Sequence, residues 1–103
     1  MSLEIVDKKK KNDYWKVSLK GEMDINSYTS VKNELNDMIK KETLDLKIDC
    51  SELSYIDSTG IGVLIGILKK IKKKDKMLYI INAEKNIKRL FNITGLDKIF
   101  VIK

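Results

Sequence analysis

The sequence predicts an α/β domain in which a mixed β-sheet carries its helices mainly on one face. After an opening hairpin, predicted strands and helices alternate in the order β-β-α-β-α-β-α-β, which implies right-handed parallel crossovers beside one antiparallel pair. Polar and apolar residues alternate within the second and third predicted strands, as expected for a sheet with one solvated face. At 103 residues, the chain is expected to form a single domain over residues 1–103.

The first two elements are predicted to form a β-hairpin. Apolar residues alternate with polar ones in the second segment, which indicates a strand with one buried face. The apolar positions of the two strands are Leu3, Ile5, Trp15, Val17 and Leu19. The polar segment 8–13, KKKKND, is expected to form the turn, and Gly21 is expected to end the second strand.

An amphipathic helix is predicted from Tyr28 to about Lys41, because apolar residues recur there at helical spacing. The stripe consists of Tyr28, Val31, Leu35, Met38 and Ile39. The preceding loop offers Asn26 or Ser27 as the N-cap.

A strand is predicted over residues 44–50, because leucine, isoleucine and cysteine alternate there with charged residues. Cys50 is the only cysteine, so no internal disulfide can form. We expect its thiol to be a small buried apolar group in a protein of a reducing compartment.

A second helix is predicted after the polar segment 57–60, with an apolar stripe that ends at Ile71. Gly62 and Gly66 lie four residues apart on one side of this helix. Each glycine lowers helix stability by about 1 kcal/mol relative to alanine. Close packing of this backbone against the sheet or against a partner is therefore expected to compensate.

The last third of the chain is predicted to contain a strand at residues 77–81, a short helix and a closing strand at residues 98–102. Asn82 is expected to cap the short helix, which turns apolar residues such as Ile87 inward. Gly95 is expected to end that helix.

The composition narrows the possible functions. Histidine is absent, which removes the commonest general base and metal ligand, and neither a cofactor nor a metal is expected. No export signal is visible, and the longest uncharged apolar run, residues 60–68, is about half of what a bilayer crossing requires. A cytoplasmic location is expected.

The net charge of +6 comes with two lysine clusters, at residues 8–11 and 69–76. Such clusters can mark a surface for nucleic acid or membranes, or simply a solvated turn and a solvated helix end. Arg89 is the only arginine, and no aromatic residues stand between the lysines. Because base recognition favours arginine and exposed rings, we expect no direct contact with nucleic acid and none with a membrane.

The polar segment 57–60, Asp-Ser-Thr-Gly, is open to several interpretations. A phosphate-binding P-loop requires a lysine at its end, but the next lysine is Lys69. A nucleophile elbow requires glycine two residues before Ser58 and a histidine base, and both are missing. A helix N-cap formed by Asp57 or Ser58 remains possible, as does a site on which another protein acts.

The string DCSELSYIDSTGIG, residues 49–62, resembles the central signature of anti-sigma factor antagonists, the STAS-domain family. The segments GEMDINSY, residues 21–28, and IKRLFNITGLDKIFVI, residues 87–102, resemble two further family motifs in the same order. Cys50 stands where the family commonly has leucine. Because Lys103 follows soon after the last predicted strand, the C-terminal helix of many relatives is expected to be short or missing.

The resemblance implies a STAS-type fold and a regulatory binding protein rather than an enzyme, with no catalytic residues of its own. Family members bind an anti-sigma factor that has serine kinase activity, which releases a sigma factor for transcription. Phosphorylation of the serine matching Ser58 ends the binding, and a metal-dependent serine phosphatase restores it. The alternatives are an unphosphorylated STAS subunit of a signalling or lipid-transport complex, and a nucleotide-binding protein.

Ser58 is accordingly predicted to be the phosphoacceptor and part of the partner surface. The other residues expected at this surface are Asp24, Tyr28, Asp57, Thr59, Gly60, Ile61 and Gly62. Three of them have a simpler alternative: Asp24 can be a loop acid, Asp57 a helix cap, and Ile61 a core residue. Thr59 is a less favoured alternative acceptor.

Overall fold

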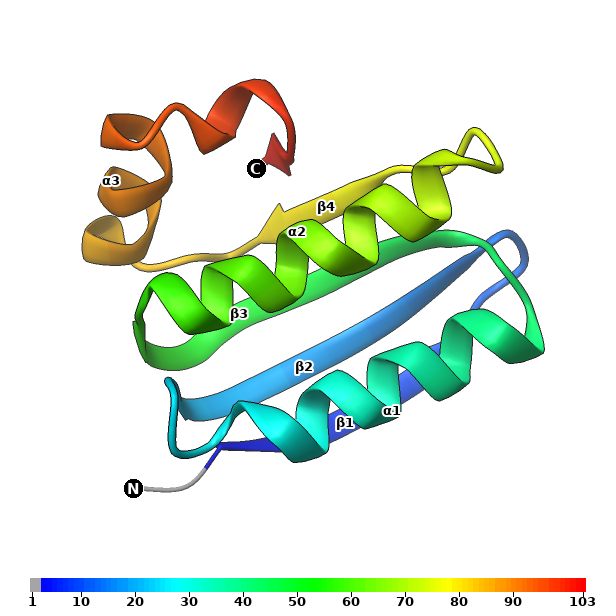
Figure 1. The fold of residues 1–103 in the computed structure, drawn as a ribbon, viewed down its shortest axis with the longest axis horizontal. Helices are drawn as coiled ribbons and strands as arrows, with labels where there is room; N and C mark the ends of the chain where they lie inside the picture. Colours follow the sequence, from blue (N-terminus) through cyan, green and yellow to red (C-terminus); the bar gives the residue numbers. More distant parts are fainter. Residues whose placement is uncertain (1–2) are drawn as a thin grey trace.

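The computed structural model describes residues 3–103, which form one five-stranded sheet with its helices (Figure 1). The elements are β1 (Leu3–Lys10), β2 (Tyr14–Met23), α1 (Tyr28–Lys41), β3 (Asp45–Ile56), α2 (Ser58–Lys72), β4 (Leu78–Ile81), α3 (Lys85–Ile93), the 3-10 helix η1 (Leu96–Lys98) and β5 (Val101–Ile102). The strands lie side by side in sequence order. β1 and β2 are antiparallel and the other pairs are parallel. The predicted mixed sheet and element order are confirmed.

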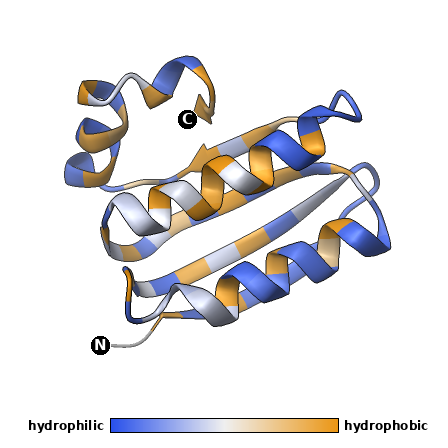
Figure 2. Cartoon of the chain, in the orientation of Figure 1, coloured by the Kyte–Doolittle hydropathy of each residue, from blue (hydrophilic) through white to orange (hydrophobic). Residues whose placement is uncertain are grey.

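The core lies between the sheet and helices α1 and α2, which run side by side over one face (Figure 1). Alternate residues of β3, among them Leu46 and Ile48, are fully buried against these helices. Phe91 of α3 joins the same core and meets Phe100 edge to face, with 5.6 Å between ring centroids. Figure 2 shows apolar residues interspersed along the central strands and α2, and polar residues on much of α1 and towards the C-terminal end of α2.

The other residues of the strands point to the opposite face, which α1 and α2 leave uncovered. Tyr14, Lys47 and Tyr79 meet there, with the Lys47 Nζ 4.0 Å from the Tyr14 ring centroid and 5.8 Å from that of Tyr79. The lysine stem covers apolar ring surface while its charge stays near water. The prediction of helices mainly on one face is therefore confirmed.

Three strands are longer than predicted. β2 does not end at Gly21 but continues to Met23, because residues 21–23 still pair with β3. β1 continues to Lys10 because residues of the expected turn pair with β2, and the side chains of Lys8 and Lys10 form ion pairs with Glu34 and Glu42. β3 continues to Ile56 because its pairing with β2 persists across irregularities in register. Exposed residues at this point interrupt the regular alternation, which concealed the extension in the sequence.

The C-terminal third differs from the prediction in two places. Asn82 does not cap α3: its backbone adopts a left-handed conformation, and Glu84 is the N-cap without a side-chain hydrogen bond. The closing strand contains only residues 101–102, because the chain first forms η1. Gly95 follows the end of α3 with φ of 75°, which confirms the predicted helix stop.

Candidate functional site

The candidate site lies where β2 and β3 end next to each other. These strands are parallel, so their carboxyl ends meet at one edge of the sheet, where such sheets commonly place functional loops. Met23 pairs with Ile56 in the last register position, and the N–H of Asp57 donates to the Met23 carbonyl at 3.1 Å. The loop after β2 is thereby held beside the start of α2.

Asp57 joins these two segments through its carboxylate. Its Oδ1 accepts a hydrogen bond from the Gly60 N–H at 3.0 Å, which caps α2, and its Oδ2 accepts from the Ile25 N–H at 3.3 Å. Of the two predicted caps, Asp57 is confirmed. The bond to Ile25 adds a second role, because the same side chain fixes the loop before α1.

Ser58 is the first residue of α2 and is exposed. Among residues 3–103, its hydroxyl forms no hydrogen bond with another protein group, so the oxygen is available to an approaching molecule. Thr59 is half-buried. The phosphoacceptor role of Ser58 stays a prediction at this point.

Asp24 organises the loop between β2 and α1. Its Oδ1 accepts hydrogen bonds from the Asn26 N–H at 2.9 Å and from the Ser27 hydroxyl at 3.0 Å. Ser27 occupies the N-cap position of α1, one of the two predicted, but provides no side-chain cap. Its hydroxyl instead forms hydrogen bonds within the loop. The backbone conformation beside Ser58 therefore depends on both Asp24 and Ser27.

The glycines of α2 have opposite surroundings. Gly60 is buried, and a Cβ added there would lie 2.7 Å from the Met23 carbonyl oxygen and 2.8 Å from a side-chain carbon of Ile56. Gly62 and Gly66 are exposed, and a Cβ at either would meet nothing within 4 Å. Of the two expected compensations for Gly62 and Gly66, close packing against the sheet is wrong and close packing against a partner stays a prediction. Gly60, in contrast, does permit close approach of a neighbouring strand.

Ile25 is a feature of the site that the sequence interpretation missed. This residue is 66% exposed in the loop that Asp57 holds beside Ser58. The remaining predicted surface residues, Tyr28 and Ile61, are half-buried and pack partly against the core. An isoleucine between Asp24 and Asn26 in a polar loop is the signal that could have revealed this exposed apolar group.

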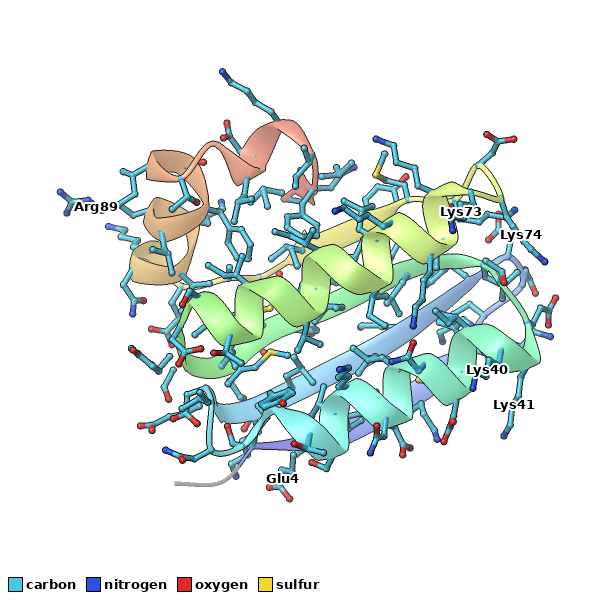
Figure 3. The ribbon with its side chains drawn as sticks, viewed as in Figure 1. Glu4, Lys40, Lys41, Lys73, Lys74 and Arg89 are labelled. Atoms are coloured by element: carbon cyan, nitrogen blue, oxygen red, sulfur yellow. The ribbon has the colours of Figure 1, made fainter. Side chains whose placement is uncertain are left out.

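The lysines at the C-terminal ends of α1 and α2 lie away from Ser58. Figure 3 shows Lys40, Lys41, Lys73 and Lys74 where α1 and α2 end, at the opposite end of both helices from Ser58. The site itself carries the carboxylates of the two linked loops. The four lysines at the helix ends therefore lie at the far end of both helices from a negative charge added at Ser58.

No helix within residues 3–103 is long and apolar enough to span a bilayer.

The described residues offer neither a metal site nor a reactive thiol. No group of three or more potential metal ligands occurs within residues 3–103. Burial, followed by the nearby charge of Asp49, raises the pKa of Cys50 to about 12. This thiol is therefore protonated at neutral pH and inert, as expected for a core residue.

Comparison with known proteins links this geometry to one family. The model of the STAS domain matches residues 6–103. An anti-sigma-B factor antagonist from Listeria monocytogenes is 36% identical over 103 residues, which are 100% of this chain and 90% of that protein. A putative anti-sigma factor antagonist from Thermotoga maritima has a solved structure with a TM-score of 0.85 and 23% identity, covering 93% of this chain and 83% of that one.

A further solved structure has the same fold. The Bacillus cell fate determinant SpoIIAA, in its phosphorylated form, has a TM-score of 0.69 and 19% identity, covering 98% of this chain and 88% of that one.

Proposed function

The chain belongs to the STAS domain family, and on that premise we propose that it is an anti-sigma factor antagonist switched by phosphorylation of Ser58. In its unphosphorylated form it binds an anti-sigma factor with serine kinase activity, which frees a sigma factor for transcription. It acts by binding and has no catalytic activity of its own. The observation that carries the proposal is the exposed hydroxyl of Ser58 at the start of α2, beside a loop fixed by Asp57.

The surface around Ser58 has the mixed character of a protein interface. Exposed Ile25 offers an apolar contact, half-buried Tyr28 and Ile61 extend it, and Asp24 adds a rim of charge. Interfaces commonly combine an apolar centre with a polar rim, and a few such residues supply most of the binding free energy. We expect the partner to cover this surface and to bring its own active site to Ser58.

A phosphate on Ser58 is compatible with the fold. It would lie at the N-terminus of α2, where backbone N–H groups and the helix dipole favour negative charge. It would also add a charge of about −1.5 to −2 beside the carboxylate of Asp57. The domain therefore stays folded while the contact surface becomes more negative and bulkier.

This local change is sufficient for a switch. Each loss of about 1.4 kcal/mol in binding free energy lowers the affinity tenfold. A buried dianion without a partner at the centre of an interface costs several times that amount. A metal-dependent serine phosphatase would restore the binding form, and the whole cycle would take place in the cytoplasm.

Phosphorylation and binding can be tested separately. The anti-sigma factor from the organism that encodes this chain is incubated with the protein and ATP, and the modified residue is identified by mass spectrometry. We expect the phosphate on Ser58 only. Phosphate on another residue, or none, would contradict the assignment.

The affinity of the same anti-sigma factor is then measured by calorimetry for two variants. Ser58→Ala is expected to bind like the wild-type chain, and Ser58→Asp is expected to bind at least about tenfold more weakly. Asn33→Asp, which adds the same charge on the exposed side of α1, is the control and should bind normally. Equal affinity for the two Ser58 variants would instead support a STAS subunit that is not regulated by phosphorylation.

A further inference from the structure

A groove with a volume of about 300 Å³ runs between α1 and α2, starting beside the proposed phosphorylation site. Thr59, the neighbour of Ser58, lines one end together with Tyr28, and Lys70 lines the other end. Gly62 and Gly66 line it between these ends. The groove is therefore continuous with the surface proposed to bind the anti-sigma factor.

The chain itself gives no reason for glycine at positions 62 and 66. A Cβ at either position would meet nothing within 4 Å, and both residues have ordinary helical backbone angles rather than the left-handed ones that favour glycine. Alanine would therefore stabilise the helix at no steric cost. Residues that lower stability in this way commonly serve function, and glycine allows another backbone to approach closely.

The charged side chains at the groove have one sign. The Lys32 Nζ lies 5.9 Å from the centroid of the Tyr28 ring, and the Lys70 Nζ donates a hydrogen bond to Oδ1 of Asn36 across the groove. None of the residues that line the groove in the described part of the chain is acidic. Both lysines are thus positioned to pair with carboxylates of a partner that enters the groove.

We propose that this groove receives an acidic helix of the anti-sigma factor, so that the partner contacts α2 well beyond Ser58. From Thr59 to Lys70 the groove follows about 16 Å of helix, which corresponds to three turns of a partner helix. A floor of glycines between two helices suits close packing of a third helix. The proposal rests on the proposed function, because it assigns a second contact to the same partner.

Two substitutions test the groove without touching the switch. Gly66→Ala and Gly66→Leu place a side chain on the groove floor two turns away from Ser58. We expect Gly66→Ala to raise the melting temperature by about 4 °C. We also expect the affinity for the purified anti-sigma factor to fall, by about tenfold or more for Gly66→Leu.

A matched pair of lysines tests the charge. Lys70 lines the groove, whereas its neighbour Lys69 is exposed outside it. Lys70→Gln is expected to lower the affinity about fivefold and to weaken its dependence on salt, and Lys69→Gln is expected to change neither.

The possible results separate the two proposals. If Gly66→Leu binds as tightly as the wild-type chain while Ser58→Asp does not, the groove inference is wrong and the proposed function stands. If Lys69→Gln and Lys70→Gln have equal effects, the acidic helix is wrong. If the wild-type chain does not bind the anti-sigma factor at all, both proposals fall.

Discussion

The first turn of α2 and the two turns that follow it differ in what their glycines contact. Gly60 is enclosed by the end of β2 and by Ile56, so closely that any side chain would overlap the Met23 carbonyl. Gly62 and Gly66 face open space on the same helix. One glycine is therefore required by packing inside the chain, whereas the other two lower helix stability without any structural gain.

Along α2, the first turn therefore contributes to the stability of the fold, whereas the later turns are assigned to partner binding. The first turn is fixed by contacts to the loop before α1, and it presents Ser58 in a defined geometry. The later turns line the groove between α1 and α2, which remains free in the isolated chain. Substitutions in the two regions should therefore change stability in opposite directions.

The largest effect is expected for Gly60→Ala. The new methyl group would lie 2.7 Å from a backbone oxygen, which cannot move aside as a flexible side chain could. We expect a loss of about 2–3 kcal/mol in the free energy of unfolding, measured by urea denaturation. A loss below about 0.5 kcal/mol would mean that β2 and α2 do not pack as closely as described.

The next effect is expected for Asp57→Ala, which removes both the helix cap and the acceptor of the Ile25 N–H. The expected loss is about 1–2 kcal/mol in the same denaturation experiment. Asp57→Asn retains an acceptor oxygen and should lose less. If both variants are as stable as the wild-type chain, the first turn is not held by this carboxylate.

A gain in stability is expected for Gly62→Ala. No atom of the chain blocks the added methyl group, so the change should raise the free energy of unfolding by about 0.5–1 kcal/mol. Thermal unfolding followed by circular dichroism measures this gain. A destabilised variant would contradict the open surroundings of this position and remove the contrast with Gly60.

The smallest effect is expected for Lys70→Ala. Its hydrogen bond to Asn36 is exposed, and surface substitutions of this kind usually change stability by less than about 0.5 kcal/mol. Urea denaturation should therefore give nearly the wild-type free energy of unfolding. A loss above about 1 kcal/mol would show that Lys70 holds α1 and α2 together, so that the groove has a structural role.

Much of the fold could be predicted because its elements have clear periodicity. The alternation over residues 44–50 and the helical stripe that ends at Ile71 are sufficient to indicate β3 and α2. The extension of β3 to Ile56 was missed because strand pairing, rather than alternation, determines it. Asn82 was assigned as a cap from its residue type, but its left-handed backbone places it outside the helix.

The site was predictable in outline and not in its contacts. The motif placed Ser58 at a strand-to-helix junction, and the structure has it there, exposed. The hydrogen bond between Asp57 and Ile25 joins residues 32 positions apart, which no local pattern indicates. The contrast between Gly60, which packs against the end of β2, and Gly62, which faces open space, depends on tertiary packing, so residue type alone could not distinguish them.

The parallel pairing of β2 and β3 has a consequence for when the surface around Ser58 comes into existence during synthesis. The loop before α1 forms one half of this surface and the first turn of α2 forms the other, so α1 separates them in the sequence. They meet only after β3 has been synthesised and has paired with β2. Contacts of this separation form late, because the intervening chain must first be closed into a loop. A nascent or misfolded chain therefore lacks the assembled surface. A protein that recognises this surface binds only chains that have finished folding.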